Sequence, residues 1–174
     1  MSTLKVNTIQ DTSGNVQPFG VEIADNWIIT SSYSTNGTSN MDINWARQSS
    51  TLSNIGTIGS AMTQSSGVFT FPSTGIYLVL GSLYAVTSGG RTFIGMTHQL
   101  STDSGSNFSS ALTGYQNGYQ NNAYVFVQSV NVYDITNTST HKIKFKTDVS
   151  DTISVTGSNT NKTTGVSFIR LGDT

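Results

Sequence analysis

Short runs in which apolar and polar residues alternate follow one another along most of this chain, separated by glycine, asparagine and proline. Alternation with a period of two is typical of β-strands that bury one face. No stretch shows the 3.6-residue periodicity of a helix for long enough to predict one. The pattern therefore predicts an all-β protein, an antiparallel sandwich or jelly roll. The expected strands cover residues 26–30, 42–48, 67–71, 75–86, 91–101, 108–115, 123–136, 141–149, 152–157 and 165–172.

Two of these segments are apolar on both faces, which a half-buried strand does not need. In residues 75–86 one face carries Ile76, Leu78, Leu80, Tyr84 and Val86, and the other carries Tyr77, Val79, Leu83 and Ala85. In residues 123–136, Tyr124 and Phe126 oppose Val125 and Val127. One face of each strand fits the core between two sheets. The second face needs another cover, either long loops of the same chain or a neighbouring subunit, and we favour the subunit.

Composition narrows the class of partner. The 174 residues suit one domain with a short appendage, and only 10% of them are charged. A net charge of −1 gives no electrostatic case for binding nucleic acid. No apolar run is long enough to cross a membrane, no cysteine is present, and the first residues lack the pattern of a signal peptide. A virion protein, made in the host cytoplasm and released by lysis, fits this combination.

The stretch GVFTFPSTGIYLVLGSLY, residues 67–84, resembles the signature hairpin of the complement globular-head and tumour-necrosis-factor-like (TNF-like) jelly rolls. The closing TGVSFIRLG, residues 164–172, is similar to the last strand of that family, and residues 141–157 stand where its penultimate strands lie. The resemblance spans about residues 25–174 and implies a jelly roll that forms homotrimers, with aromatic residues near the three-fold axis. This chain departs from the family in having fewer charges and more Asn, Ser and Thr.

These two lines of reasoning give five candidates for the trimer interface. The resemblance implies Tyr77, Phe69 and Phe71, and the two-sided strand adds Tyr124 and Phe126.

The first 24 residues are expected to form an anchoring arm. Their STLKVNTIQDTSGN is similar to the N-terminal segment of fibre-like and structural proteins of marine tailed phages. The resemblance implies attachment to a capsid or tail protein through Leu4, Val6 and Ile9, with the jelly-roll head, residues 25–174, displayed outward.

Catalytic and metal chemistry find little support. The two histidines, His98 and His141, lie in strand-like segments, and no Gly-x-Ser-x-Gly elbow accompanies them. Asp103, Asp148 and Asp151 are read as turn-forming residues, because aspartate caps turns and no Asp-x-Asp-x-Asn-Gly calcium loop is present. We expect no enzyme activity, no cofactor and no metal.

A basic run, KIKFK, places Lys142, Lys144 and Lys146 on one face of a strand and Ile143 and Phe145 on the other. It could read phosphate or polysaccharide. We favour the solvated face of a strand, one that lies at the edge of a sheet and is protected by its lysines.

The segment GYQNGYQNNAY, residues 114–124, is expected to be a polar, glycine-containing loop. Rigid tyrosines among adaptable polar neighbours are typical of recognition loops. Tyr115, Asn117 and Tyr119 are therefore candidates for binding a host cell-surface glycan. The same tyrosines could instead pack against a neighbouring subunit, and the sequence does not separate the two.

Together these inferences predict a trimeric virion surface protein without enzyme activity, which would be a capsid decoration, a head fibre or a tail-fibre tip. The alternative is a soluble carbohydrate-binding or signalling module of the same fold.

Overall fold

The computed structural model describes residues 9–10, 16–17, 21–48, 57–89 and 92–174. Every regular element in these ranges is a β-strand, and every strand pair is antiparallel. Within the same ranges no helix could cross a membrane. The strands are β1 (Ile9–Gln10), β2 (Val16–Gln17), β3 (Ile23–Ile29), β4 (Tyr33–Thr35), β5 (Thr38–Asn40), β6 (Trp45–Arg47), β7 (Thr63–Ser65), β8 (Val68–Thr70), β9 (Gly75–Thr87), β10 (Thr92–Ser101), β11 (Ser109–Gly118), β12 (Tyr124–Ile135), β13 (Lys142–Val149), β14 (Ile153–Val155) and β15 (Gly165–Gly172).

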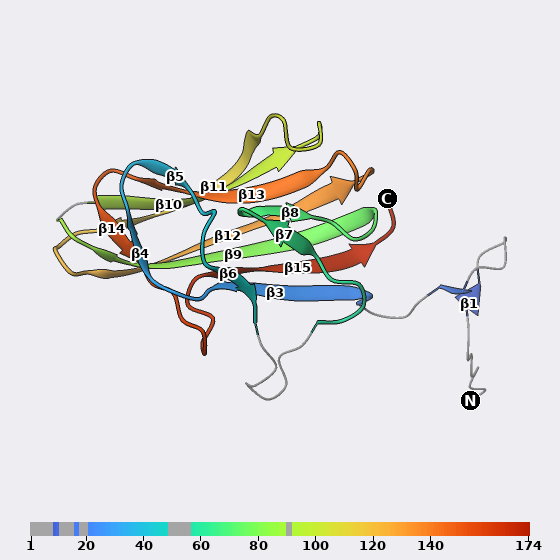
Figure 1. The fold of residues 1–174 in the computed structure, drawn as a ribbon, viewed down its shortest axis with the longest axis horizontal. Helices are drawn as coiled ribbons and strands as arrows, with labels where there is room; N and C mark the ends of the chain where they lie inside the picture. Colours follow the sequence, from blue (N-terminus) through green and yellow to red (C-terminus); the bar gives the residue numbers. More distant parts are fainter. Residues whose placement is uncertain (1–8, 11–15, 18–20, 49–56, 90–91) are drawn as a thin grey trace, which may run out of the picture.

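Two sheets stack face to face, as Figure 1 shows. The large sheet has the order β4-β14-β9-β15-β3-β6, and β12 pairs with the free edge of β9. The small sheet has the order β11-β10-β13-β8-β7, and β5 pairs with β13. The short strands β1 and β2 pair only with each other among the described strands. The all-β, antiparallel prediction is therefore confirmed.

Strand β9 is the spine of the large sheet. It pairs with β12 along its whole length from Gly75 to Val86, and with β15 and β14 on its other edge. Its side chains alternate between buried and half-buried positions, so that Tyr77, Val79 and Leu83 point into the core. Such alternation places one face of the sheet against the small sheet and leaves the other face outside the sandwich.

An aromatic cluster joins the two sheets at the centre of the core. Phe69 of β8 lies edge-on to Trp27 at 5.4 Å and to Trp45 at 5.2 Å between ring centroids. It also contacts Phe145 of β13 at 5.8 Å and Phe168 of β15 at 5.2 Å. Edge-to-face pairs add to the burial of large apolar side chains, so Phe69 connects strands of both sheets.

The turn between β8 and β9 explains the Gly-x-Tyr spacing of the signature hairpin. Gly75 has a φ of +137°, and a Cβ there would lie 2.5 Å from Gly172 O, so only glycine fits. The hydroxyl of Tyr77 donates to Ser73 O at 3.0 Å and thereby holds the turn against the strand that follows it. The Gly-x-Tyr motif therefore stabilises the hairpin turn between β8 and β9.

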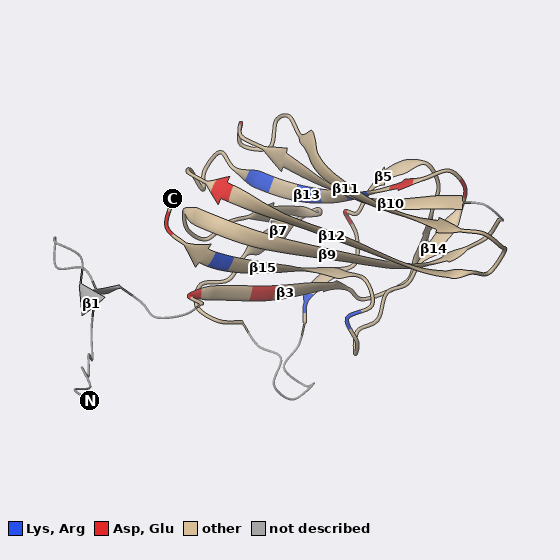
Figure 2. Ribbon diagram, turned by 180° about the vertical axis from the view of Figure 1, so that it is seen from behind, with Lys and Arg blue, Asp and Glu red and all other residues tan. Residues whose placement is uncertain are grey.

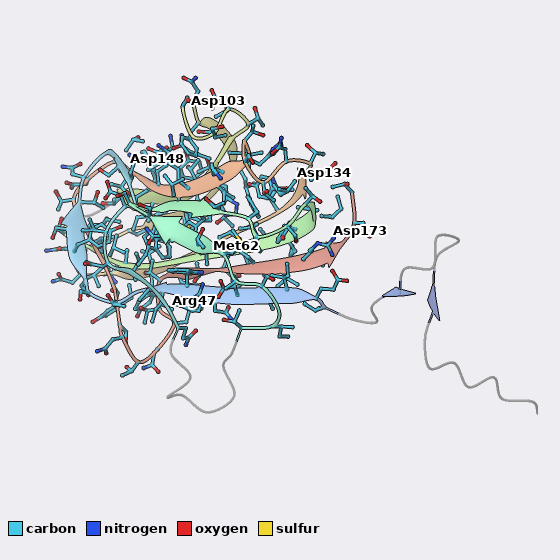
Figure 3. The ribbon with its side chains drawn as sticks, turned by 45° about the vertical axis from the view of Figure 1, so that its right-hand side comes forward. Arg47, Met62, Asp103, Asp134, Asp148 and Asp173 are labelled. Atoms are coloured by element: carbon cyan, nitrogen blue, oxygen red, sulfur yellow. The ribbon has the colours of Figure 1, made fainter. Side chains whose placement is uncertain are left out.

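A buried carboxylate holds the edge of the large sheet. Asp25 of β3 is fully buried and accepts from Trp27 Nε1 at 3.0 Å, Arg47 Nε at 2.9 Å and Met62 N at 2.9 Å. Arg47 also donates to Met62 O at 2.7 Å, and both residues are labelled in Figure 3. These hydrogen bonds compensate the cost of removing the Asp25 carboxylate from water. They also join β3, β6 and the segment before β7.

Candidate functional site

The outward side of the large sheet carries an apolar surface that one polar pair, Gln128 and Ser82, interrupts. On β12, Phe126, Val130 and Val132 are 51%, 52% and 51% exposed. Tyr84 and Tyr124 stack beside them with ring centroids 5.8 Å apart. The register of β12, β9 and β15 places these side chains next to one another. We call this set the apolar face; it comprises Ile76, Leu78, Leu80 and Tyr84 of β9, Tyr124, Phe126, Val130 and Val132 of β12, and Ile169 of β15.

No described loop covers the middle of the apolar face, as the exposure of the β12 side chains shows. Figure 2 shows no charged residue on β9 and only one on β12, which is Asp134 near its end. Large exposed patches without charge mark interaction sites on soluble proteins. The second face of both two-sided strands is therefore open in the isolated chain.

Three of the five interface candidates are wrong. Phe69, Phe71 and Tyr77 are 0%, 1% and 0% exposed and lie between the two sheets, where they cannot touch another subunit. They form the aromatic core instead, with Phe71 packed edge-on against Tyr77 at 4.9 Å. Tyr124 and Phe126 are 71% and 51% exposed and belong to the apolar face.

A lysine that the sequence analysis did not single out reaches the apolar face. Lys162 comes from the segment between β14 and β15, and its Nζ donates to Ser167 Oγ and lies 3.5 Å from Asn26 Oδ1. It lines a depression together with Leu80, Gly81, Ser82, Phe126, Gln128, Val130 and Ser167. Burial lowers the pKa of Lys162 to about 8, since the charged form loses water there.

The three recognition candidates lie on or beside a strand of the small sheet, and the loop predicted around them is much shorter than expected. Tyr115 and Asn117 belong to β11, which continues to Gly118. Tyr119 follows in the turn and is 76% exposed. The prediction of one long loop is wrong, because β11 pairs with β10 as far as Gly118. The glycine and asparagine residues of β11 are typical of turns, and their presence led to the prediction of a loop.

The hydroxyl of Tyr115 is held on the small sheet. It donates to Asp148 Oδ2 at 2.7 Å, and its ring packs edge-on against Phe93 at 5.8 Å between centroids. Phe93 and Asp148 were not recognised as partners of Tyr115, because only the register of three strands brings them together.

His98 lies inside the core. Its Nδ1 is 3.0 Å from the hydroxyl of Tyr133 and its Nε2 is 2.8 Å from Ser129 Oγ. Burial lowers the pKa of His98 to about 4. A serine beside a histidine is the arrangement of a nucleophile and its base, but here the two side chains are enclosed between the sheets, with 0% and 3% exposure. The network serves to satisfy polar groups within the core.

The carboxylates behave differently from one another. Asp103 closes a turn as predicted; hydrogen bonds from Asn107, together with one from Ser101, lower the pKa of Asp103 to about 2. Asp151 accepts from Thr152 N at 2.7 Å in a turn. Asp148 lies within β13, so the prediction of a turn there is wrong. Among the described residues no three metal-binding side chains of His, Asp or Glu lie close enough to hold an ion.

The basic run alternates as predicted, with Ile143 and Phe145 buried in the core and the three lysines on the outward side of β13. The prediction of an edge strand is wrong, because β13 has β10 on one side and both β8 and β5 on the other. Two of the lysines are engaged locally. Lys144 Nζ lies 4.4 Å from the ring centroid of Phe108, and Lys142 donates to Thr138 O at 2.9 Å.

The predicted arm falls mostly outside the described residues, which exclude Leu4 and Val6. Ile9 lies in β1 and pairs with Gln17 of β2. Strand β3 begins at Ile23, so the last residues assigned to the arm are part of the large sheet.

Comparison with known proteins places the fold. No protein-family model matches the chain, and no curated protein sequence matches it. Among solved structures, Eiger TNF from S. frugiperda is 14% identical, with a TM-score of 0.68 over 87% of this chain and 94% of that chain. Murine APRIL at pH 5.0 is 13% identical, with a TM-score of 0.62 over 86% of this chain and 98% of that chain. At such identities the likeness concerns the fold alone, and the chain has the antiparallel jelly roll of TNF-like proteins.

Proposed function

We propose that this chain is a virion surface protein that assembles as a homotrimer through the apolar face. In this proposal the N-terminal segment attaches the trimer to a capsid or tail protein, and the outward side of the small sheet contacts the host surface. The observation that carries the proposal is the apolar face itself, since its central side chains are half exposed in the isolated chain.

The pattern of exposure supports assembly in two ways. Leaving Phe126, Val130 and Val132 in water forgoes the hydrophobic gain that burial would give, roughly 25 cal/mol for each Å² removed from water. The strand that carries them is regular and fully paired with β9, so the surface is rigid and ready to dock. A stable trimer of this kind should bury on the order of 2,000 Å² at each interface.

Composition and the arm support display on a particle. The chain combines a low content of charge, 10%, with no cysteine, and its first residues are similar to those of phage structural proteins. A homotrimer on one attachment point would present three copies of any weak binding site. Binding to a surface would then gain through effective concentration without any new contact.

The test is immunogold electron microscopy of lysate particles with an antibody raised against this chain. Label on the head or on the tail supports the proposal and separates a decoration or head fibre from a tail-fibre tip. Intact particles without label, with the chain abundant in solution, would contradict it and favour the soluble binding or signalling module.

A deletion of residues 1–20 refines the test, because these residues precede β3 and the sandwich. The deletion variant should remain trimeric in solution and lose its place on the particle. Full incorporation of this variant would refute the role given to the arm.

A further inference from the structure

A row of four residues crosses the outward side of the small sheet. The strand register aligns Tyr115 of β11 with Gly95 of β10, Gly95 with Asp148 of β13, and Asp148 with Thr38 of β5. Neighbouring strands lie about 4.8 Å apart, so the tyrosine must reach across one strand to meet the aspartate. The 2.7 Å hydrogen bond from Tyr115 to Asp148 Oδ2 shows that it does.

Glycine in the second position of the row lets the ring lie over the sheet. A Cβ built at Gly95 would lie 2.5 Å from Cε1 of Tyr115, so the ring occupies the space that a side chain would fill. Tyr115 is nevertheless 56% exposed. One side of the ring therefore packs on the backbone of β10, and the other side is open to solvent and anchored at its hydroxyl.

A second aromatic ring makes a corner with the first. Phe93, two residues before Gly95, is 39% exposed, and its ring is inclined at 77° to that of Tyr115 with centroids 5.8 Å apart. The two rings, nearly perpendicular to each other, therefore form two apolar sides of a shallow corner. Sites for small ligands combine such apolar surfaces with a few polar groups that fix orientation.

Polar groups border this corner. Asp148 Oδ1 accepts from Thr38 Oγ1 at 2.9 Å, and the hydrogen bond from Tyr115 lowers the pKa of Asp148, which keeps the carboxylate ionised. Asn117 lies directly opposite Phe93 in the register. The carboxylate has lone pairs left after two hydrogen bonds, and the asparagine amide both donates and accepts.

We propose that this aromatic platform, Phe93, Tyr115, Asn117 and Asp148, binds a neutral pyranose of a cell-surface glycan. The C–H face of a pyranose stacks on the open side of the Tyr115 ring, and its hydroxyls donate to Asp148 and exchange hydrogen bonds with Asn117. A sugar acid fits less well, because its carboxylate would approach that of Asp148. The proposal rests on the host-contact part of the proposed function and gives it a site and a ligand class.

The platform lies on the opposite side of the sandwich from the apolar face, since the small sheet carries the one and the large sheet the other. Figure 3 shows Asp148 on the β13 side, away from β3 and β15. Assembly through the apolar face would thus leave three platforms uncovered. A shallow, half-exposed site of this kind is weak alone and depends on several copies for useful binding.

Saturation-transfer NMR on the full chain tests the platform, with cellohexaose, maltohexaose and mannohexaose as neutral probes and hexagalacturonate as the acidic probe. We expect transfer to the ring protons of at least one neutral probe and weaker transfer to hexagalacturonate. Tyr115→Ala should weaken binding by about tenfold or more, because the stacking surface is lost. Tyr115→Phe keeps the ring and should weaken it less.

Gln120→Ala is the control, since Gln120 is exposed in the turn after β11 and lies outside the platform, so this variant should leave the transfer unchanged. Phe93→Ala is the second variant, which replaces Tyr115→Ala as the test if that variant does not fold. It should also weaken binding. No transfer to any neutral probe, stronger transfer to hexagalacturonate, or equal loss in Gln120→Ala would overturn the proposal. The mass of the same samples keeps the two hypotheses apart: a trimer without sugar binding refutes only the platform, and a monomer that binds sugar refutes only the trimer.

Discussion

Acid should destabilise this protein through His98, well before its carboxylates are protonated. The imidazole lies at hydrogen-bond distance from Tyr133 and Ser129 and edge-on to Phe145 at 5.0 Å, with no exposed surface. Burial lowers the pKa of His98 from 6.5 to about 4, so the folded chain keeps the histidine neutral where the unfolded chain already binds a proton. Stability from this group is complete above pH 6.5 and is lost as the pH falls toward 4.

The size of the effect follows from the two pKa values. Each pH unit between them is worth about 1.36 kcal/mol. Between pH 7.5 and pH 4.5, His98 should therefore cost the folded state roughly 2–3 kcal/mol. With a urea dependence of about 2 kcal/mol per molar, the unfolding midpoint should fall by roughly 1 M.

The assay is urea unfolding at fixed protein concentration, since the proposed assembly would also contribute to stability. His98→Gln removes the titrating group and should flatten the curve over this pH range. His141→Gln is the control, because His141 precedes β13 and its Nδ1 lies 3.0 Å from Asn137 O, away from the Ser129–His98–Tyr133 network. Equal pH dependence in the original chain and in His98→Gln would refute the reasoning, and an NMR titration that gives His98 an ordinary pKa would do the same.

Three further predictions concern assembly and the signature hairpin. Val130→Asp puts a charge into the apolar face and should convert the trimer to monomer in light scattering, whereas Thr102→Asp in the exposed turn after β10 should not; a trimeric Val130→Asp would show that assembly uses another surface. Lys162 has a pKa of about 8, and assembly through the apolar face would cover its ammonium group, which must then lose either its proton or its hydrating water. Lys162→Met should therefore strengthen assembly and remove the pH dependence of assembly between pH 7 and 9. Weaker assembly of this variant would mean that a neighbouring subunit supplies an anion to Lys162. Tyr77→Phe should lower the free energy of unfolding by about 1–2 kcal/mol, since the hydrogen bond to Ser73 O is lost, and an unchanged urea midpoint would count against that role.

Period-two alternation was enough to predict the fold class and most of the long strands. It also marked β9 and β12 as apolar on both faces, and continuing it along β12 would have reached Val130 and Val132. The alternation does not say which face is the core. The resemblance to TNF-like jelly rolls assigned Phe69, Phe71 and Tyr77 to the interface, but these side chains are buried between the two sheets.

The aromatic platform and the position of Lys162 could not be predicted, because both depend on tertiary structure. Tyr115 meets Asp148 only because β10 lies between their strands, with a glycine at the crossing point. Lys162 reaches Ser167 and Asn26 because the segment before β15 folds back over Gly165, a close approach that no local pattern marks. Cross-strand register places the residues of the platform together, and the path of the loop before β15 places Lys162 on the apolar face.

The most direct test of the central claim is the molar mass of the purified full chain by size-exclusion chromatography with light scattering. The account predicts three times the chain mass of 18.6 kDa, unchanged on dilution through the micromolar range. A mass of 18.6 kDa at all concentrations would contradict it, because the apolar face would then remain exposed in solution with no partner to cover it.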